Sequence, residues 1–122
     1  MRMQKEHQQI FASAARTATV AATIAARSTQ GLFFINVTAV TSTPSVVFTI
    51  AGVSPNGDVA YTILESAAIT GTGLTVLRVS PHLTAAANTI AKDMLPSGLK
   101  ITATHADTDS ITYSMHFLGC DE

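Results

Sequence analysis

Charged side chains are scarce in this chain. They make up 12% of its 122 residues, about half of the share found in an average soluble domain. The thirty residues from 28 to 57 include no Asp, Glu, Lys or Arg. Catalytic sites usually depend on titratable groups held close together. Because such groups are so few, we expect a structural protein without catalytic residues rather than an enzyme.

Other absences narrow the possible partners. The chain has no Trp, and aromatic residues make up only 6% of it, which is too few for the stacking surfaces of single-strand nucleic-acid-binding proteins. Its single cysteine, Cys120, excludes an internal disulfide and agrees with synthesis in a reducing cytoplasm. No run of 18 or more apolar residues is present. We therefore expect neither a nucleic-acid partner nor a membrane span.

Hydrophobic residues make up 47% of the sequence. With so few charges, the exposed faces must be neutral and polar or must be covered by other proteins, which favours assembly, including a homo-oligomer. The charges are also unevenly divided. Residues 1–27 hold four Lys and Arg against one Glu, a net charge of +3, and the remaining chain holds three against seven acids, a net charge of −4.

Short β-branched segments separated by turn residues predict an all-β fold. We expect an antiparallel sandwich of the jelly-roll or immunoglobulin-like type with seven or eight strands, including residues 32–41, 45–53, 60–69 and 74–80. The segments 32–41 and 45–53 are apolar on both faces, which is typical of strands with neighbours on both sides. The sequence Ser54-Pro55-Asn56-Gly57 predicts a hairpin turn.

Two segments leave alternatives open. Residues 10–26 are rich in Ala and Thr, so a helix competes with a strand, and the β-branched residues from Thr17 onward favour the strand. In residues 82–95 a possible N-cap and apolar residues at helical spacing fit either a short helix or an irregular crossover. These residues are Thr84, Leu83, Ala87, Ile90 and Met94.

The last two expected strands, residues 99–107 and 110–118, are interpreted as a hairpin. Pairing Ile101 with Phe117 and His105 with Tyr113 places the apolar side chains of both strands on one face. The same register puts His105 and His116 on opposite faces. Because a metal site needs at least three converging ligands, we expect no metal and no cofactor.

Acidic residues offer two weaker possibilities. Asp107-Thr108-Asp109 begins like a calcium-binding loop but lacks the later Gly and Glu of a complete one, so we expect a turn, with an interfacial cation as the alternative. Three further acids could meet in space as a catalytic carboxylate pair would. They are Asp58, Glu65 and Asp93.

Residues 1–16 are expected to form an N-terminal arm that precedes a sandwich domain of residues 17–122. The arm is basic whereas the body is acidic, and 16 extended residues can reach roughly 50 Å, far enough to cross a neighbouring subunit. We therefore expect it to bind a partner protein. The residues expected to make this contact are Arg2, Lys5, Ile10, Phe11 and Arg16.

Four blocks of the sequence resemble small structural proteins encoded by tailed bacteriophages. They are SAARTATV (residues 13–20), VTAVTSTPSVVFTI (37–50), SAAIT (66–70) and DSITYS (109–114), within a likeness that extends over about residues 13–118. Residues 1–11 match no pattern of that family.

The resemblance implies a β-sandwich protein of the virion. It implies a decoration or cement protein bound to the outside of the head, with the major capsid protein or other virion proteins as partners, after synthesis in the host cytoplasm. The alternatives are a protein of the neck, tail or fibre, or a receptor- or carbohydrate-binding module. The scarcity of aromatic residues argues against stacking on sugars.

Overall fold

The computed structural model describes residues 4–57 and 60–121, without the side chains of Gln4 and Asp121. This part of the chain contains nine β-strands in two sheets and no helix. The five-stranded sheet has the order β1 (Gln4–Arg16), β9 (Ile111–Asp121), β3 (Gln30–Val40), β6 (Gly73–Val79) and β7 (Ile90–Ala91). The four-stranded sheet has the order β2 (Val20–Ala25), β8 (Gly98–His105), β4 (Val46–Val53) and β5 (Ala60–Glu65).

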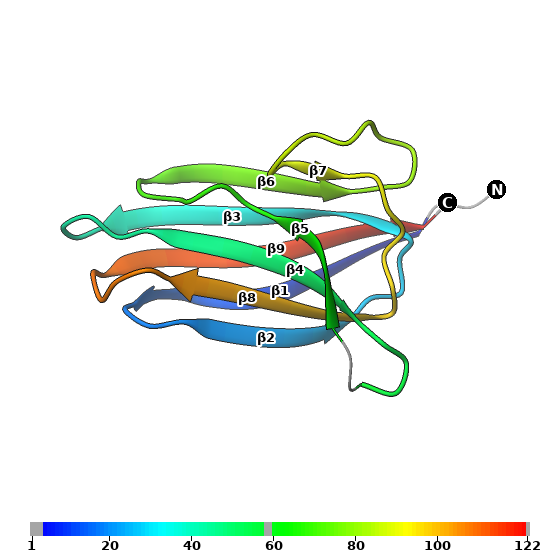
Figure 1. Cartoon of the computed structure of the whole chain (residues 1–122), viewed down its shortest axis with the longest axis horizontal. Helices are drawn as coiled ribbons and strands as arrows, with labels where there is room; N and C mark the ends of the chain where they lie inside the picture. The colour runs from blue at the N-terminus through cyan, green and yellow to red at the C-terminus, as the bar shows by residue number, and fades with distance from the viewer. Residues whose placement is uncertain (1–3, 58–59, 122) are drawn as a thin grey trace.

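The strand order is that of a jelly roll. Strands β1 to β4 alternate between the two sheets, β4 and β5 form a hairpin within one sheet, and the chain alternates again through β6, β8 and β9. All pairs are antiparallel except the contact of the two-residue strand β7 with β6. Figure 1 shows the strands of the two sheets crossing the molecule in roughly the same direction. The predicted all-β sandwich is confirmed, and the jelly-roll alternative is the one observed.

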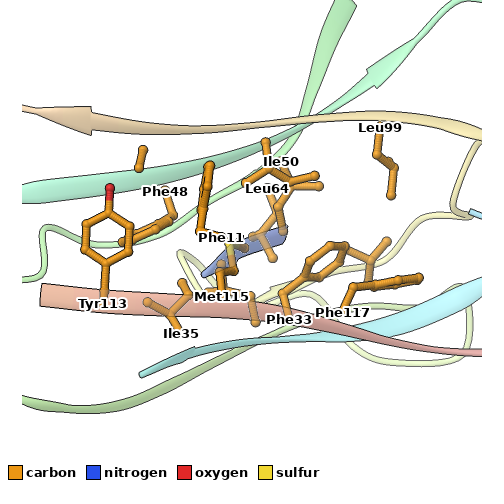
Figure 2. Packing of buried hydrophobic residues seen from close by; sticks show 14 of the residues in the cluster. Phe11, Phe33, Ile35, Phe48, Ile50, Leu64, Leu99, Tyr113, Met115 and Phe117 are labelled. Atoms are coloured by element: carbon orange, nitrogen blue, oxygen red, sulfur yellow. The ribbon is translucent and has the colours of Figure 1, made fainter. Parts of the chain in front are cut away.

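The core lies between the two sheets and is built from alternate residues of each strand. Phe48 and Ile50 of β4 point toward Tyr113, Met115 and other side chains of the opposite sheet (Figure 2). The rings of Phe48 and Tyr113 meet edge to face, with centroids 5.1 Å apart. This interleaving of apolar side chains, rather than any charged contact, supplies most of the stabilisation.

The charge-free stretch forms the centre of both sheets. Strand β3 pairs with β9 and β6, and β4 pairs with β8 and β5, so both strands have neighbours on each side, as their two apolar faces predict. The hairpin turn after β4 is also confirmed. Gly57 has a φ of 83°, and its backbone N–H donates to the Ser54 carbonyl oxygen over 2.7 Å.

The predicted hairpin of the last two strands is wrong. Strand β8 pairs with β2 and β4, whereas β9 lies in the other sheet between β1 and β3. The apolar sets of both strands do face one another, but across the core rather than along one sheet. Alternating apolar residues satisfy either arrangement, because both place the same side chains in the core.

The segment 82–95 is the irregular crossover, not the helix. Leu83 and Met94, which the helical spacing would have buried, are 37% and 61% exposed, and Ile90 belongs to β7. The extended alternative for the Ala- and Thr-rich segment is also the one observed, because Val20, Thr23 and Ile24 lie in β2.

Residues 1–16 are expected to form an arm that precedes the sandwich domain of residues 17–122. From Gln4 onward the arm is strand β1, which pairs with β9 along its whole length as an edge of the five-stranded sheet (Figure 1). The pairing has two register shifts, between Gln9 and Phe11 and between Phe11 and Ala14. These irregularities break the alternation of side chains, so the sequence pattern of a strand is hidden there.

Candidate functional site

The outer face of the five-stranded sheet carries a strip of apolar side chains. The pairing of β3 with β6 and β9 places their even-numbered residues side by side on this face. The apolar members, here called the apolar strip, are Leu32, Phe34, Leu74, Val76 and Leu118. Leu74 is 62% exposed, and the others are half-buried. A contiguous apolar surface of this kind is typical of a contact with another protein.

A pocket of about 530 Å³ lies at one end of the apolar strip, between the sheet and the loop that joins β6 to β7. Leu32 and Leu118 line it from the sheet, and Leu83 lines it from the loop. Lys5 and Arg78 supply positive charge, and none of the described residues that line the pocket is acidic. An apolar floor beside two cations suits a protein segment or ligand that carries an apolar group next to an anionic one.

The root of this loop is fixed to the sheet by a buried hydroxyl group. The Ser80 side chain donates to the Gln30 side-chain oxygen over 2.7 Å and accepts the backbone N–H of His82 over 3.1 Å. Ser80 is buried, so these bonds satisfy its polar atoms without water. The loop wall of the pocket is therefore held in place where it leaves β6.

Two stacked imidazoles join β1 to β9 on the same outer face. The rings of His7 and His116 are nearly parallel, with an interplanar angle of 9° and centroids 5.2 Å apart. The nitrogens Nε2 of His7 and Nδ1 of His116 lie 3.2 Å apart, so one ring must donate a proton and the other must accept it. Sequence analysis missed this pair because it did not place residues 4–9 in the sheet.

A carboxylate ties β1 to the segment that follows β2. Glu6 Oε1 accepts the backbone N–H of Arg27 and the hydroxyl of Ser28, each over 2.7 Å. Burial raises the pKa of Glu6, but hydrogen bonds from Ser28, Arg27 and Gln8 outweigh this effect, so the pKa lies below its usual value. The Gln8 side chain also donates to the Ala25 carbonyl oxygen over 2.6 Å.

The far end of β1 is held by an aromatic and cationic cluster. The Arg16 guanidinium lies over the rings of Tyr113 and Phe11, at 4.6 and 5.4 Å from their centroids, and donates to the backbone carbonyl of Tyr113 over 2.8 Å. His105 Nε2 lies 3.1 Å from the Tyr113 hydroxyl.

Burial sets the protonation of this cluster. It raises the pKa of Tyr113 to about 12, although the nearby Arg16 acts in the opposite direction. Burial also lowers the pKa of His105, which Asp107 partly offsets and Arg16 reinforces. The cluster therefore holds a neutral phenol and favours a neutral imidazole, as a packed structural contact does.

The five residues predicted to contact a partner have different surroundings. Arg2 lies outside the described residues, Lys5 is exposed beside the pocket, and Ile10 is half-buried against the core. Phe11 is 6% exposed within the core, and Arg16 is committed to the cluster described above. Phe11 and Arg16 therefore make their contacts within the chain and cannot bind a partner as long as β1 stays paired.

The acidic candidates lie in two separate places. The backbone N–H of Asp109 donates to Asp107 Oδ1, and that of Thr43 donates to Asp109 Oδ2, so this segment is the predicted turn. Glu65 and Asp93 line one exposed hollow of about 490 Å³, while Asp58 lies outside the described residues. Within residues 4–57 and 60–121, no group of three or more His, Cys, Asp or Glu is placed to hold a metal ion.

Comparison with known proteins supports the fold and nothing finer. No protein-family model and no curated protein sequence matches the chain. Among solved structures, it is similar to a chain in the structure of infectious bursal disease virus, Gx strain, with a TM-score of 0.57 and 9% sequence identity. The similarity covers 99% of this chain but only 33% of that one.

No helix within the described residues is long and apolar enough to cross a membrane.

Proposed function

We propose that the chain is a non-enzymatic structural protein of a virus particle, and that it decorates the head of a tailed bacteriophage. The observation that carries this proposal is the jelly roll, 99% of which matches one third of a chain in a virus structure. The resemblance of residues 13–118 to phage structural proteins supports the choice of particle.

The outer face of the five-stranded sheet is the surface that would bind the capsid. It presents the apolar strip together with the pocket that Lys5 and Arg78 make basic. A capsid segment with an apolar residue beside a carboxylate would bury apolar area and pair with these cations. Lys5 lines this pocket, so it would take part in the docking expected for residues 1–16.

Repetition on the particle compensates for a contact of modest size. A decoration protein binds many equivalent positions on a symmetric shell, and subunits that also touch each other bind with avidity. The contact of one subunit therefore need not be tight for the layer to be stable.

Two other assignments are consistent with the same fold. A protein of the neck, tail or fibre would use the same sandwich at a lower copy number, set by the symmetry of that part of the particle. A receptor- or carbohydrate-binding module would bind cells rather than particles. The lack of Trp and the exposure of only one large aromatic side chain among the described residues, Tyr61 at 47%, argue against sugar stacking.

Co-sedimentation with purified heads tests the proposal. We expect the protein to pellet with heads in hundreds of copies per particle, and we expect Leu74→Asp to weaken this binding. Thr104→Asp is the matched control, because Thr104 is exposed on the four-stranded sheet and should leave binding unchanged. A protein that ignores heads but binds tails or cells would overturn the decoration role, and about a dozen copies per particle would indicate the neck.

A further inference from the structure

Strand β2 is an edge strand without the features that usually prevent edges from pairing. Natural edges are protected by charges, prolines, bulges or extreme shortness. Strand β1 has two register shifts and the charged Lys5, β5 has a register shift and Glu65, and β7 has only two residues. In contrast, β2 pairs with β8 in unbroken register over six residues, Val20 to Ala25, that include no charge and no proline.

The backbone groups of β2 that point away from β8 can be identified from three hydrogen bonds. The N–H of Ala26 donates to Ser97, which directly precedes β8, so even-numbered residues turn their backbone groups toward β8. The carbonyl of Ala25 and the N–H of Arg27 instead bond to side chains of β1. Odd-numbered residues therefore point outward, and β8 is the only described strand that pairs with β2. Ala21 and Thr23 thus present two N–H and two C=O groups at the open edge.

We propose that β2 pairs with β2 of a second copy of this chain in antiparallel fashion, across a two-fold axis at Ala22. Ala21 of each copy would then exchange both backbone hydrogen bonds with Thr23 of the other. The two four-stranded sheets would join into one continuous sheet of eight strands, and the existing bond from Gln8 to Ala25 would stay intact.

A second copy is the occupant that the edge itself favours. Its side chains are small or half-buried, with Ala21 and Thr23 exposed on one face and Val20, Ala22 and Ile24 on the other. A two-fold pairing places no two charges opposite each other, because Arg27 would lie opposite Thr17 of the second copy. An uncharged edge offers no electrostatic preference for a charged partner strand, but it is complementary to itself.

The contact is small, so it should be weak in solution. One pair of six-residue strands buries much less than the ~1,200 Å² of a stable protein interface. We expect a dissociation constant on the order of 0.1–1 mM. A pairing of this strength becomes effective when other contacts hold the copies side by side. The pairing goes beyond the proposed function, since it can be measured without any virus particle. The pairing of β2 and the binding to heads can each be correct when the other is not.

Sedimentation velocity at protein concentrations up to about 1 mM tests the pairing. We expect a concentration-dependent dimer, and at least a tenfold lower association constant for Thr23→Lys, which adds the charge that the edge lacks. Thr62→Lys is the matched control on the edge strand β5, where Thr62 is also exposed, and it should behave like the unmodified chain. A monomer at all concentrations, or equal weakening by both substitutions, would overturn the proposal.

Disulfide trapping tests the register. Residues at the two-fold axis form a non-hydrogen-bonded pair with Cα atoms ~4.5 Å apart, which lies within the range that a disulfide spans. In a Cys120→Ser background, Ala22→Cys should therefore give a covalent dimer on mild oxidation, whereas Thr62→Cys should not. Equal cross-linking of both variants, or none at Ala22→Cys, would exclude this arrangement. Thermal unfolding of each variant confirms that the fold is retained.

Discussion

Replacement of Phe11 by Ala tests whether the N-terminal segment is a strand of the core or a free arm. The Phe11 side chain is 6% exposed, meets Tyr113 edge to face at 6.1 Å and lies under Arg16. A buried ring removes on the order of 150 Å² of apolar surface from water, which corresponds to about 3–4 kcal/mol. The aromatic pair adds ~1 kcal/mol, but partial collapse at a sheet edge recovers a similar amount. We therefore expect the free energy of unfolding to fall by about 3–4 kcal/mol.

Urea denaturation of the purified protein measures this change directly. Gln9→Ala is the matched control, because Gln9 is exposed two residues before Phe11 in β1 and its replacement should cost less than about 0.5 kcal/mol. Removal of residues 1–16 should be more severe than Phe11→Ala, since it uncovers the hydrogen-bonding edge of β9 as well as the core. A loss of less than about 1 kcal/mol for Phe11→Ala would show that β1 does not cover the core in solution. The N-terminal segment would then be a free arm.

Three further outcomes are expected from the same unfolding assay. Glu6→Ala removes two hydrogen bonds to the segment after β2 and should cost about 1–2 kcal/mol; no change would mean that this link is not formed. The pKa of His105 is lower in the folded protein than its usual 6.5, so its stabilising contribution is complete above about pH 6.5 and is lost as the pH falls below that value. His105→Gln should therefore flatten the pH dependence between pH 7.5 and 5, and an unchanged slope would contradict this assignment. Gly31→Ala would push a methyl group into the Phe117 ring and should cost about 1–3 kcal/mol, whereas Gly71→Ala meets no atom within 4 Å and serves as its control.

The centre of the sandwich could be predicted from sequence because its strands can bury both of their apolar faces only in the middle of a sheet. Strands β3 and β4 are apolar on both faces, so they must be central in any sheet, and the Pro-Asn-Gly turn ends β4 in any topology. The pairing of β8 and β9 could not be predicted in this way. Their alternating apolar residues reach the core from one sheet or from opposite sheets, and only the other strands decide between these arrangements.

The candidate site was less predictable than the fold. Its floor uses residues such as Leu32 and Leu118, which look like core residues because the opposite face of the same strands is also apolar. Its wall is the loop between β6 and β7, where the spacing of Leu83 and the apolar residues after it also fitted a short helix. The stack of His7 on His116 joins residues that are 109 positions apart, and no local pattern marks such a pair.

The pairing of β1 with β9 has a consequence for the order of folding. Gln4 lies opposite Asp121, so the first described strand meets its partner only when the last one is available. The hairpin of β4 and β5 can form early from local contacts, but the five-stranded sheet must wait for a closure across almost the entire chain. Such closures are slow, because the entropy of a long loop is lost before the contacts that compensate for it are made. During synthesis, the apolar side of β1 and the edge of β3 that later pairs with β9 are therefore exposed to incorrect pairing with another chain.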